Sequence, residues 1–384
     1  MSTREALTTV ARTPSIGNHC GMSLRPLYGH SALRARLAAS VHVGRLPASL
    51  LLQGKRGVGK QRLGLWLGQL LLCETATATG SPEPCGECVH CRYSIRGQHP
   101  DLHWFFPRPR LKDGDASPDE VKADLAEAVA ERMQAEGLWS PSVGTEALYV
   151  ATVRALVAQA SLRPAMARRS VFIVGDAERM VAQEGSDQAA NAFLKLLEEP
   201  PPDATLILTS SEPGALLPTI RSRVVTIRVA PLPAPDMSAF LSDATVHRKF
   251  AGAVEADLIA RAAGAPGELL ATEGNAAAVT NARRILDAAL RPGSPDAAAE
   301  RIKVAARQGV AGARGMFTDT LEALTMLLHE RVRRTAVAGH VADARRSAQA
   351  IVAVEQVRLR AQGNVSPQLL GGALIEDLHR VMRP

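Results

Sequence analysis

The sequence predicts an α/β domain built on a parallel sheet, followed by two all-helical regions. Three observations lead to this fold class. A glycine-rich turn over residues 54–59 separates a short apolar strand from a helix, as in phosphate-binding units. Strand-length apolar runs alternate with helical patterns up to residue 230, which is typical of three-layer α/β domains. From residue 231 onward, helical patterns rich in Ala, Leu and Arg continue to the end.

The elements of the α/β region follow from two local patterns. Apolar residues at three- and four-residue intervals predict helices, and short continuous apolar runs predict strands buried on both faces of a parallel sheet. The run Pro200–Pro202 ends one of these helices. In chain order, the predicted elements are helix 31–43, strand 49–53, helix 60–73, apolar segment 102–106, helix 150–162, strand 170–174, helix 187–199, strand 204–209, a short helix near 215–221 and strand 224–229.

The polar stretch 107–144 is interpreted as an insertion. Ser117 supplies a capping hydroxyl, Pro118 occupies the first helical position and Glu120 the third. We therefore expect a surface helix to begin at this point, although the sequence does not indicate what the insertion does.

Further boundaries come from composition. Residues 1–22 lack hydrophobic periodicity and are expected to form a mobile tail, so Met22 could be the true start. A proline-rich linker near residue 231 ends the α/β region. Helical patterns then favour a small helical domain to about residue 280 and a helical bundle over 281–384.

The overall composition excludes several classes of protein. Hydrophobic residues make up 46% and charged residues 22%, so a disordered, collagen-like or disulfide-scaffold chain is not expected. No apolar stretch approaches the roughly 20 residues that span a bilayer, and no secretory signal is evident, so we expect a cytoplasmic protein. The net charge of +7 favours an anionic partner such as nucleic acid. Aromatic residues are too scarce, at 3%, to favour stacking on unpaired bases.

The glycine-rich turn matches the first seven positions of a phosphate-binding P-loop. In such a loop, backbone N–H groups and the helix N-terminus hold phosphate, and the lysine reaches the outer phosphates. The eighth position is Gln61, where a Ser or Thr hydroxyl would hold magnesium. Hydrolysis is therefore not expected, and the residues leave open whether the loop still binds nucleotide. The loop residues concerned are Gly54, Gly57, Gly59, Lys60 and Gln61.

A second acidic position is also altered. Asp176 follows the strand 170–174, where a nucleotidase of this type would carry an aspartate for magnesium and an adjacent glutamate that activates water. Ala177 stands at the glutamate position, and Glu178 comes one residue later, where its side chain would point in another direction. Asp176 could equally be a turn or helix-capping residue.

Four cysteines, Cys73, Cys85, Cys88 and Cys91, lie within 19 residues and predict a metal site. Four thiolates that converge on one tetrahedral ion suit structural zinc, because no coordination position remains for water. A redox role or an iron–sulfur cluster are the alternatives. His90 and His99 lie nearby and are interpreted as structural or exposed, and Cys20 as an unpaired thiol.

Two segments resemble a known family. The segment Ala190–Pro201, ANAFLKLLEEPP, and the run Thr219–Arg223, TIRSR, strongly resemble the clamp-loader subunits of bacterial DNA polymerase III, which belong to the AAA+ superfamily. The resemblance covers most of residues 24–275. It implies an AAA+ P-loop domain over 23–230 with an inserted zinc module at 73–91, then a helical lid domain over 231–280 and an all-α collar domain over 281–384.

Within this family, the altered sites resemble the delta-prime branch and differ from the gamma/tau ATPases. Gln61 and Ala177 replace catalytic residues, and Pro266–Gly267 stands where an ATPase subunit would carry an arginine. The resemblance implies a rigid, non-hydrolysing end subunit whose Arg223 acts as an arginine finger on ATP held by a neighbour. Arg221 is a competing candidate. Without the resemblance, both arginines read equally well as surface charges beside a strand.

The resemblance implies the gamma/tau and delta subunits as partners. It also implies indirect contact with the sliding clamp and contact with primer-template DNA as part of the complex.

Two other hypotheses remain open at this point. In one, the chain is an active gamma/tau-like ATPase in which Lys60 and Glu178 suffice. In the other, it is a zinc-stabilised DNA-binding protein unrelated to clamp loading.

Overall fold

The computed structural model describes residues 23–111, 116–139, 146–180, 187–250, 254–274, 276–292, 295–306, 313–361 and 366–383. The tail expected over residues 1–22, Cys20 within it, and parts of the insertion at 112–115 and 140–144 lie outside the described residues. Within them, no helix combines the length and apolar character needed to cross a membrane.

The described strands form one five-stranded parallel sheet with the order β2-β3-β4-β1-β5. The predicted strands are confirmed, and β1, β3 and β4 are buried along nearly their whole length because helices cover both faces. The strands are β1 (Ser49–Gln53), β2 (Leu102–Phe105), β3 (Ser170–Val174), β4 (Ala204–Ser210) and β5 (Val225–Arg228).

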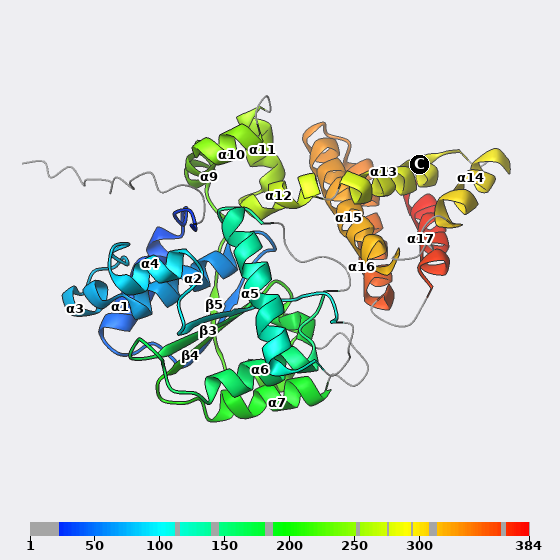
Figure 1. Ribbon diagram of the computed structural model, residues 1–384. Helices are drawn as coiled ribbons and strands as arrows, with labels where there is room; N and C mark the ends of the chain where they lie inside the picture. The colour runs from blue at the N-terminus through cyan, green and yellow to red at the C-terminus, as the bar shows by residue number, and fades with distance from the viewer. Residues whose placement is uncertain are drawn as a thin grey trace, which may run out of the picture.

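Helices cover the sheet in the manner of a three-layer fold. Helix α2 (Lys60–Leu72) packs on one face, and α6 (Val150–Ala160) and α7 (Asp187–Glu198) pack together on the other (Figure 1). Right-handed crossovers require this arrangement, because the chain moves along the sheet in opposite directions after β1 and after β3. The carboxyl ends of β1, β3 and β4 therefore meet at one edge, which is where ligands bind in such sheets.

Glycine lets α2 approach the sheet closely. A Cβ atom at Gly68 would lie 2.6 Å from Leu102 Cδ1, and one at Gly64 would meet Ile173 and Ile207 at 3.4 Å. Leu63 and Leu67 on the same helix are fully buried. Tight packing of this helix fixes the position of its first residue, Lys60.

The remaining helices of the α/β region are short or lie at its periphery. The expected capping box is confirmed at the start of α5, where Ser117 and Glu120 exchange hydrogen bonds with each other's backbone N–H groups. These elements are α1 (Ser31–His42), α3 (Glu74–Thr79), α4 (Val89–Ile95), α5 (Pro118–Gln134), α8 (Pro218–Arg221) and two 3₁₀ turns, η1 (Ala177–Met180) and η2 (Pro213–Ala215).

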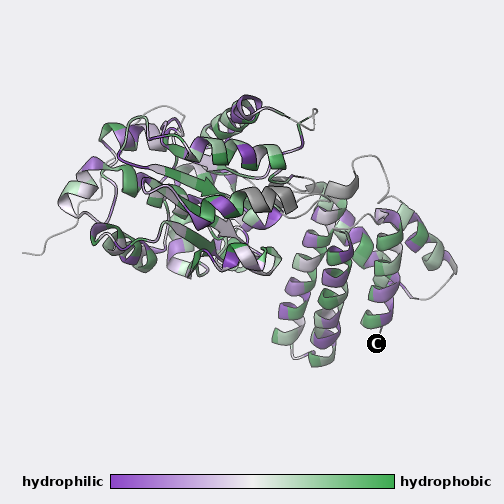
Figure 2. Cartoon of the chain, turned by 90° about the horizontal axis from the view of Figure 1, so that it is seen from below, coloured by the Kyte–Doolittle hydropathy of each residue, from purple (hydrophilic) through white to green (hydrophobic). Residues whose placement is uncertain are grey.

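Two further hydrophobic clusters follow the sheet along the chain. The first includes Leu232, Met237 and Phe240 and holds together four helices, which we call the lid: α9 (Ala234–Leu241), α10 (Ala244–Lys249), α11 (Glu255–Ala262) and α12 (Pro266–Gly274). The second holds the C-terminal bundle, whose helices carry apolar and polar residues on different faces (Figure 2). The bundle helices are α13 (Ala276–Leu290), α14 (Pro295–Ala306), α15 (Ala313–Val337), α16 (Val341–Ala361) and α17 (Pro367–Met382).

Residue 280, the boundary expected between the two helical regions, lies inside α13. Ala282 and Ile285 of this helix are buried in the bundle cluster, while the lid cluster ends with Leu269. The helix continues through residue 280 because no glycine or proline interrupts it there.

Asp101 fixes the loop that leads into β3. Its carboxylate is 2% exposed and accepts hydrogen bonds from three backbone N–H groups, those of Ala165 at 2.6 Å, Met166 at 2.8 Å and Ala167 at 2.6 Å. Burial acts to raise the pKa of Asp101, but these hydrogen bonds outweigh it and lower the pKa below its ordinary value.

Replacing Asp101 by Asn is expected to destabilise the α/β domain by about 2–3 kcal/mol at pH 7, because the amide NH₂ cannot accept a hydrogen bond. The lowered pKa means that the carboxylate contributes stability above its unfolded pKa, near 4, and loses it as the pH falls further. The difference between variant and wild type should therefore shrink in acid. Urea unfolding followed by tryptophan fluorescence measures this, since Trp66, Trp104 and Trp139 all lie in the α/β region. Asp257→Asn, a change at an exposed position, is the control. An equal loss of unfolding free energy in this control would contradict the prediction.

Candidate functional site

The P-loop lies between β1 and α2, and its lysine is held by the chain itself. Gly57 and Gly59 adopt left-handed φ angles of 74° and 97°, which residues other than glycine rarely adopt. Lys60 is 5% exposed, and its Nζ donates to the carbonyl oxygens of Gly54 and Lys55 at 3.0 Å and to Ser211 Oγ at 2.8 Å. Burial lowers the pKa of Lys60, although Asp176 and Glu178 act in the opposite direction.

Gln61 fills the position of the magnesium hydroxyl. Its Nε2 donates to Asp176 Oδ2 at 3.2 Å, and its Oε1 accepts from Trp104 Nε1 at 3.1 Å and from an Arg132 guanidinium N–H at 3.3 Å. The amide also lies against the backbone, because a Cβ atom at Gly175 would be only 2.6 Å from its Cδ. These residues do not fit a magnesium ion, since an amide donor faces the carboxylate that would otherwise help hold it.

The carboxylates after β3 are arranged as structural groups. Ala177 is fully buried, and Asp176 takes a left-handed φ of 47° while its N–H donates to Thr209 Oγ1 at 3.0 Å. Glu178 Oε1 accepts from the N–H of Ser211 at 2.9 Å. Burial, and then the charge of Asp176, raise the pKa of Glu178. Through its bond to the Ser211 N–H, Glu178 holds the residue that follows β4.

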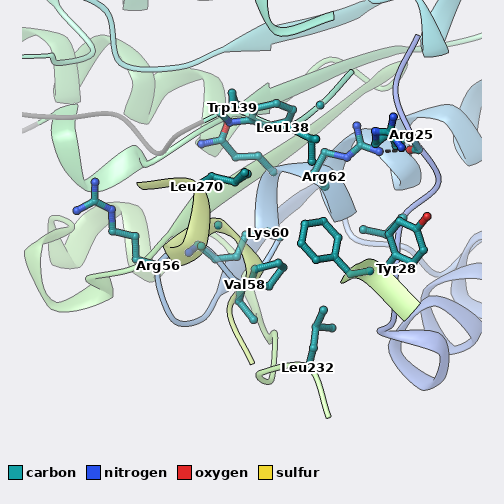
Figure 3. Close-up of a pocket in the computed structure, with 18 of the residues that line it drawn as sticks. Arg25, Tyr28, Arg56, Val58, Lys60, Arg62, Leu138, Trp139, Leu232 and Leu270 are labelled. Carbon is teal, nitrogen blue, oxygen red and sulfur yellow. Dashed lines mark hydrogen bonds between the residues drawn. The ribbon is translucent and has the colours of Figure 1, made fainter. Parts of the chain in front are cut away.

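The lid touches the P-loop directly. The N–H of Gly267 donates to the carbonyl oxygen of Gly57 at 2.9 Å, and a Cβ atom at Gly267 would lie 2.7 Å from Gly57 Cα. Arg56 of the same loop forms an ion pair with Glu322 of α15. Figure 3 shows the pocket beside the loop, lined by Tyr28, Leu138, Trp139, Leu232, Leu270 and others, with a volume of about 130 Å³.

The four cysteines converge as predicted. Their Sγ atoms all lie within 4.8 Å of one another, with 3.9 Å between Cys85 and Cys91 and 4.0 Å between Cys73 and Cys88. A tetrahedral ion with metal–sulfur bonds near 2.3 Å needs sulfurs about 3.8 Å apart, so the residues fit a metal ion. The Sγ atoms of Cys73 and Cys88 also cap α3 and α4, accepting from Ala76 N–H at 3.3 Å and Cys91 N–H at 3.5 Å.

His90 and His99 lie outside this set of four ligands. Both are buried, and His90 Nδ1 lies 2.8 Å from His99 Nε2. Because the Asp101 N–H donates to His99 Nδ1 at 3.0 Å, the proton of His99 sits on Nε2 and points to His90. Burial, and then His90, lower the pKa of His99 to about 4, so this ring is neutral at pH 7.

Arg223 follows α8 and precedes β5, at the amino end of the sheet. Its guanidinium donates to Glu198 Oε1 at 2.6 Å, to the Thr219 carbonyl at 2.9 Å and to Ser222 Oγ at 3.2 Å, and its side chain is 33% exposed. The P-loop follows the carboxyl end of β1, which pairs in parallel with β5. Arg223 and the P-loop are therefore separated by the length of the paired strands. Four residues at about 3.3 Å each make this separation about 13 Å or more. Arg223 is therefore too far away to serve the P-loop of its own chain.

Ser211 and Arg132 are site residues that the sequence reasoning missed. Ser211 follows β4 as Asp176 follows β3, so the rule that parallel strands end at one edge could have identified it. Arg132 lies on α5 within the insertion, and nothing in its local sequence indicates a contact with Gln61.

The family to which the chain belongs is shown by comparison with known proteins. The family model described as DNA polymerase III, delta subunit, matches residues 29–233. The DNA polymerase III subunit delta' of Bacillus subtilis is 30% identical over 193 residues, covering 50% of this chain and 45% of that protein. The subunit delta' of Pseudomonas aeruginosa is 33% identical over 183 residues, covering 48% and 43%. A gamma subunit-related protein structure from Thermotoga maritima aligns with 90% of this chain and 99% of its own, at 16% identity and a TM-score of 0.36, too distant to guide interpretation.

The matched region contains the features described above. It runs from the helix before the P-loop to the linker before the lid, and so includes the cysteine cluster, Asp176 and Arg223. This chain spans less than half of the length of the two delta' relatives. Because the family match covers more than half of the chain, the protein belongs to the DNA polymerase III delta subunit family, as a delta-prime-like member.

Proposed function

We propose that this protein is a non-hydrolysing subunit of the clamp loader of DNA polymerase III, which helps to place the sliding clamp on primed DNA. The observation that carries this proposal is the Gln61 amide bound to Asp176 at 3.2 Å, where an active subunit would hold magnesium. Without the metal, the site would lack the cation that bridges the phosphates and neutralises charge on a transferring phosphoryl group. The gamma/tau and delta subunits are the partners that this role requires.

The chemical contribution of the subunit is an arginine offered to a neighbour. Arg223 lies at the opposite end of the sheet from its own P-loop, and it is only partly buried. An arginine in this position supports action across a subunit boundary, where the guanidinium would stabilise charge on ATP held by an adjacent gamma/tau subunit. Arg223 would then release Glu198 and donate to the phosphate of the neighbour's ATP instead.

The cysteine cluster is proposed to hold structural zinc. Zinc accepts four thiolates in a tetrahedral arrangement, and the Sγ separations of 3.9 and 4.0 Å agree with that geometry. The ion would tie the loop after α2 to α3 and α4, both of which are capped by ligand cysteines. With all four positions taken by the chain, it would have no catalytic role.

Reconstitution with the partner subunits tests the proposed function. ATP hydrolysis stimulated by DNA and clamp is expected to require this chain, while the isolated chain is expected to show no turnover. Turnover by the isolated chain that disappears in Lys60→Ala would instead identify an active gamma/tau-like ATPase. Full loader activity in the absence of the chain, together with tight and steeply salt-dependent DNA binding by the chain alone, would identify a DNA-binding protein outside the loader.

A further inference from the structure

We infer that the insertion takes the structural place of a nucleotide: it forms one wall of the pocket beside the P-loop and links the lid to the α/β domain. The insert segment is defined here as residues 116–139, which comprise α5 and the turn that follows it. This inference concerns binding and conformation, and it stands whether or not Arg223 acts on a neighbour.

The insert segment is anchored firmly on the α/β domain. Val121, Leu125 and Met133 of α5 are buried in the main hydrophobic cluster. The Arg108 guanidinium donates to both carboxylate oxygens of Asp124, at 2.9 and 3.0 Å. The position of the end of α5 relative to the P-loop is therefore determined by packing.

The turn after α5 joins two hydrophobic clusters. Trp139 packs against the cluster of the α/β domain, and its neighbour Leu138 packs against the lid cluster. Both line the pocket, on the side opposite Val58 and Leu232 (Figure 3). Adjacent residues that contact the core and the lid link them in the way a bound ligand would.

Ion pairs reinforce the same junction. Arg25, in the segment before α1, forms ion pairs with Glu136 of the insert segment and with Asp243 of the lid. Asp243 also accepts from Tyr28 Oη at 2.7 Å and caps α10. Three parts of the chain that are distant in sequence are thus held by one network of charges.

Arg132 supplies a permanent cation beside the altered metal position. Its guanidinium carbon lies 3.4 Å from the ring centre of Phe106, 4.7 Å from that of Trp104 and 5.1 Å from that of Trp139. Its N–H donates to Gln61 Oε1 at 3.3 Å. Burial lowers the pKa of Arg132 to about 9, and the charge of Asp176 acts against this effect. The guanidinium therefore remains charged at pH 7 and attracts the charge of Asp176.

The chain itself occupies the part of the loop that would hold phosphate. Lys60 already donates to three acceptors, and Gly267 lies against Gly57. Lys60 is therefore held by the chain at the phosphate end of the pocket, and the Gln61 amide lies beside it against Asp176.

Hydrogen exchange of the full-length chain tests this inference, with MgATP as the probe. The double variant Leu138→Ala/Trp139→Ala should exchange the amides of α12, including that of Gly267, roughly tenfold faster than wild type, because the lid loses its link to the core. Glu127→Ala, an exposed change on the same helix, should leave the exchange of α12 unchanged. Adding MgATP should protect no lid amide in wild type.

Two results would overturn the inference. One is unchanged exchange of α12 in the double variant. The other is protection of the wild-type lid by MgATP, which would show that the pocket accepts nucleotide. Nucleotide binding without turnover would leave the non-hydrolysing role intact, so the two proposals can fail separately. If the double variant does not fold, Leu138→Ala alone provides the same comparison.

Discussion

Replacing Arg223 by alanine is expected to slow the DNA- and clamp-stimulated ATP hydrolysis of a reconstituted loader by about a thousandfold at the site that the arginine serves. Negative charge shifts toward the transferring group and the leaving oxygen during phosphoryl transfer, and a guanidinium placed there stabilises it. The measurement is single-turnover hydrolysis with the wild-type chain, with the variant, and with the chain omitted.

Arg221→Ala is the matched control for this experiment. Arg221 lies two residues away on α8 and is exposed, so the change removes an equal charge from the same surface. Assembly of the loader should survive both changes, because Arg223 contributes to its own chain only a partly exposed ion pair with Glu198. Wild-type rates with Arg223→Ala and slow rates with Arg221→Ala would transfer the role to Arg221. Wild-type rates with both would remove the arginine finger from the proposal.

The second large effect concerns the cysteine cluster. Cys88→Ser is expected to abolish stoichiometric zinc binding and to destabilise the module by roughly 5 kcal/mol, because the free energy of binding a structural zinc ion is also folding free energy. The loss extends beyond the ligand, since Cys88 Sγ also caps α4. Metal analysis of the purified chain measures its zinc content. Thermal unfolding with and without a chelator measures the loss of stability.

Cys20→Ser serves as the control for cysteine loss, because the sequence places Cys20 53 or more positions before the four proposed ligands. It should retain full zinc content and an unchanged melting temperature. Unchanged zinc and melting temperature in Cys88→Ser would rule out the four-ligand site. If the purified wild-type chain contains iron and absorbs visible light, the cysteines hold an iron–sulfur cluster and not zinc.

Most secondary structure could be predicted because its signals are local. The apolar runs at 49–53 and 170–174 read as buried strands, and the Ser117–Glu120 box marks the start of α5 wherever that helix packs. The cysteines could be grouped for the same reason, since their spacing brings the thiols together after a short loop.

The candidate site was only partly accessible to such reasoning. Gln61 and Ala177 could be recognised as departures from a motif, but the pattern alone says what is absent and cannot say what replaces it. The amide of Gln61 binds Asp176, which is 115 positions away, and it also accepts a hydrogen bond from Arg132 of a third segment. No local rule predicts that combination.

The sequence by itself therefore determined the order of elements, the altered P-loop and the grouping of the four cysteines. Only the tertiary structure decided that Gln61 binds Asp176, that Arg223 binds Glu198, and that residues of the insertion contact both the core and the lid. The physical reason is the range of the interactions. Hydrophobic periodicity and capping act within a few residues, whereas burial and ion pairing depend on segments that meet only after the chain has folded.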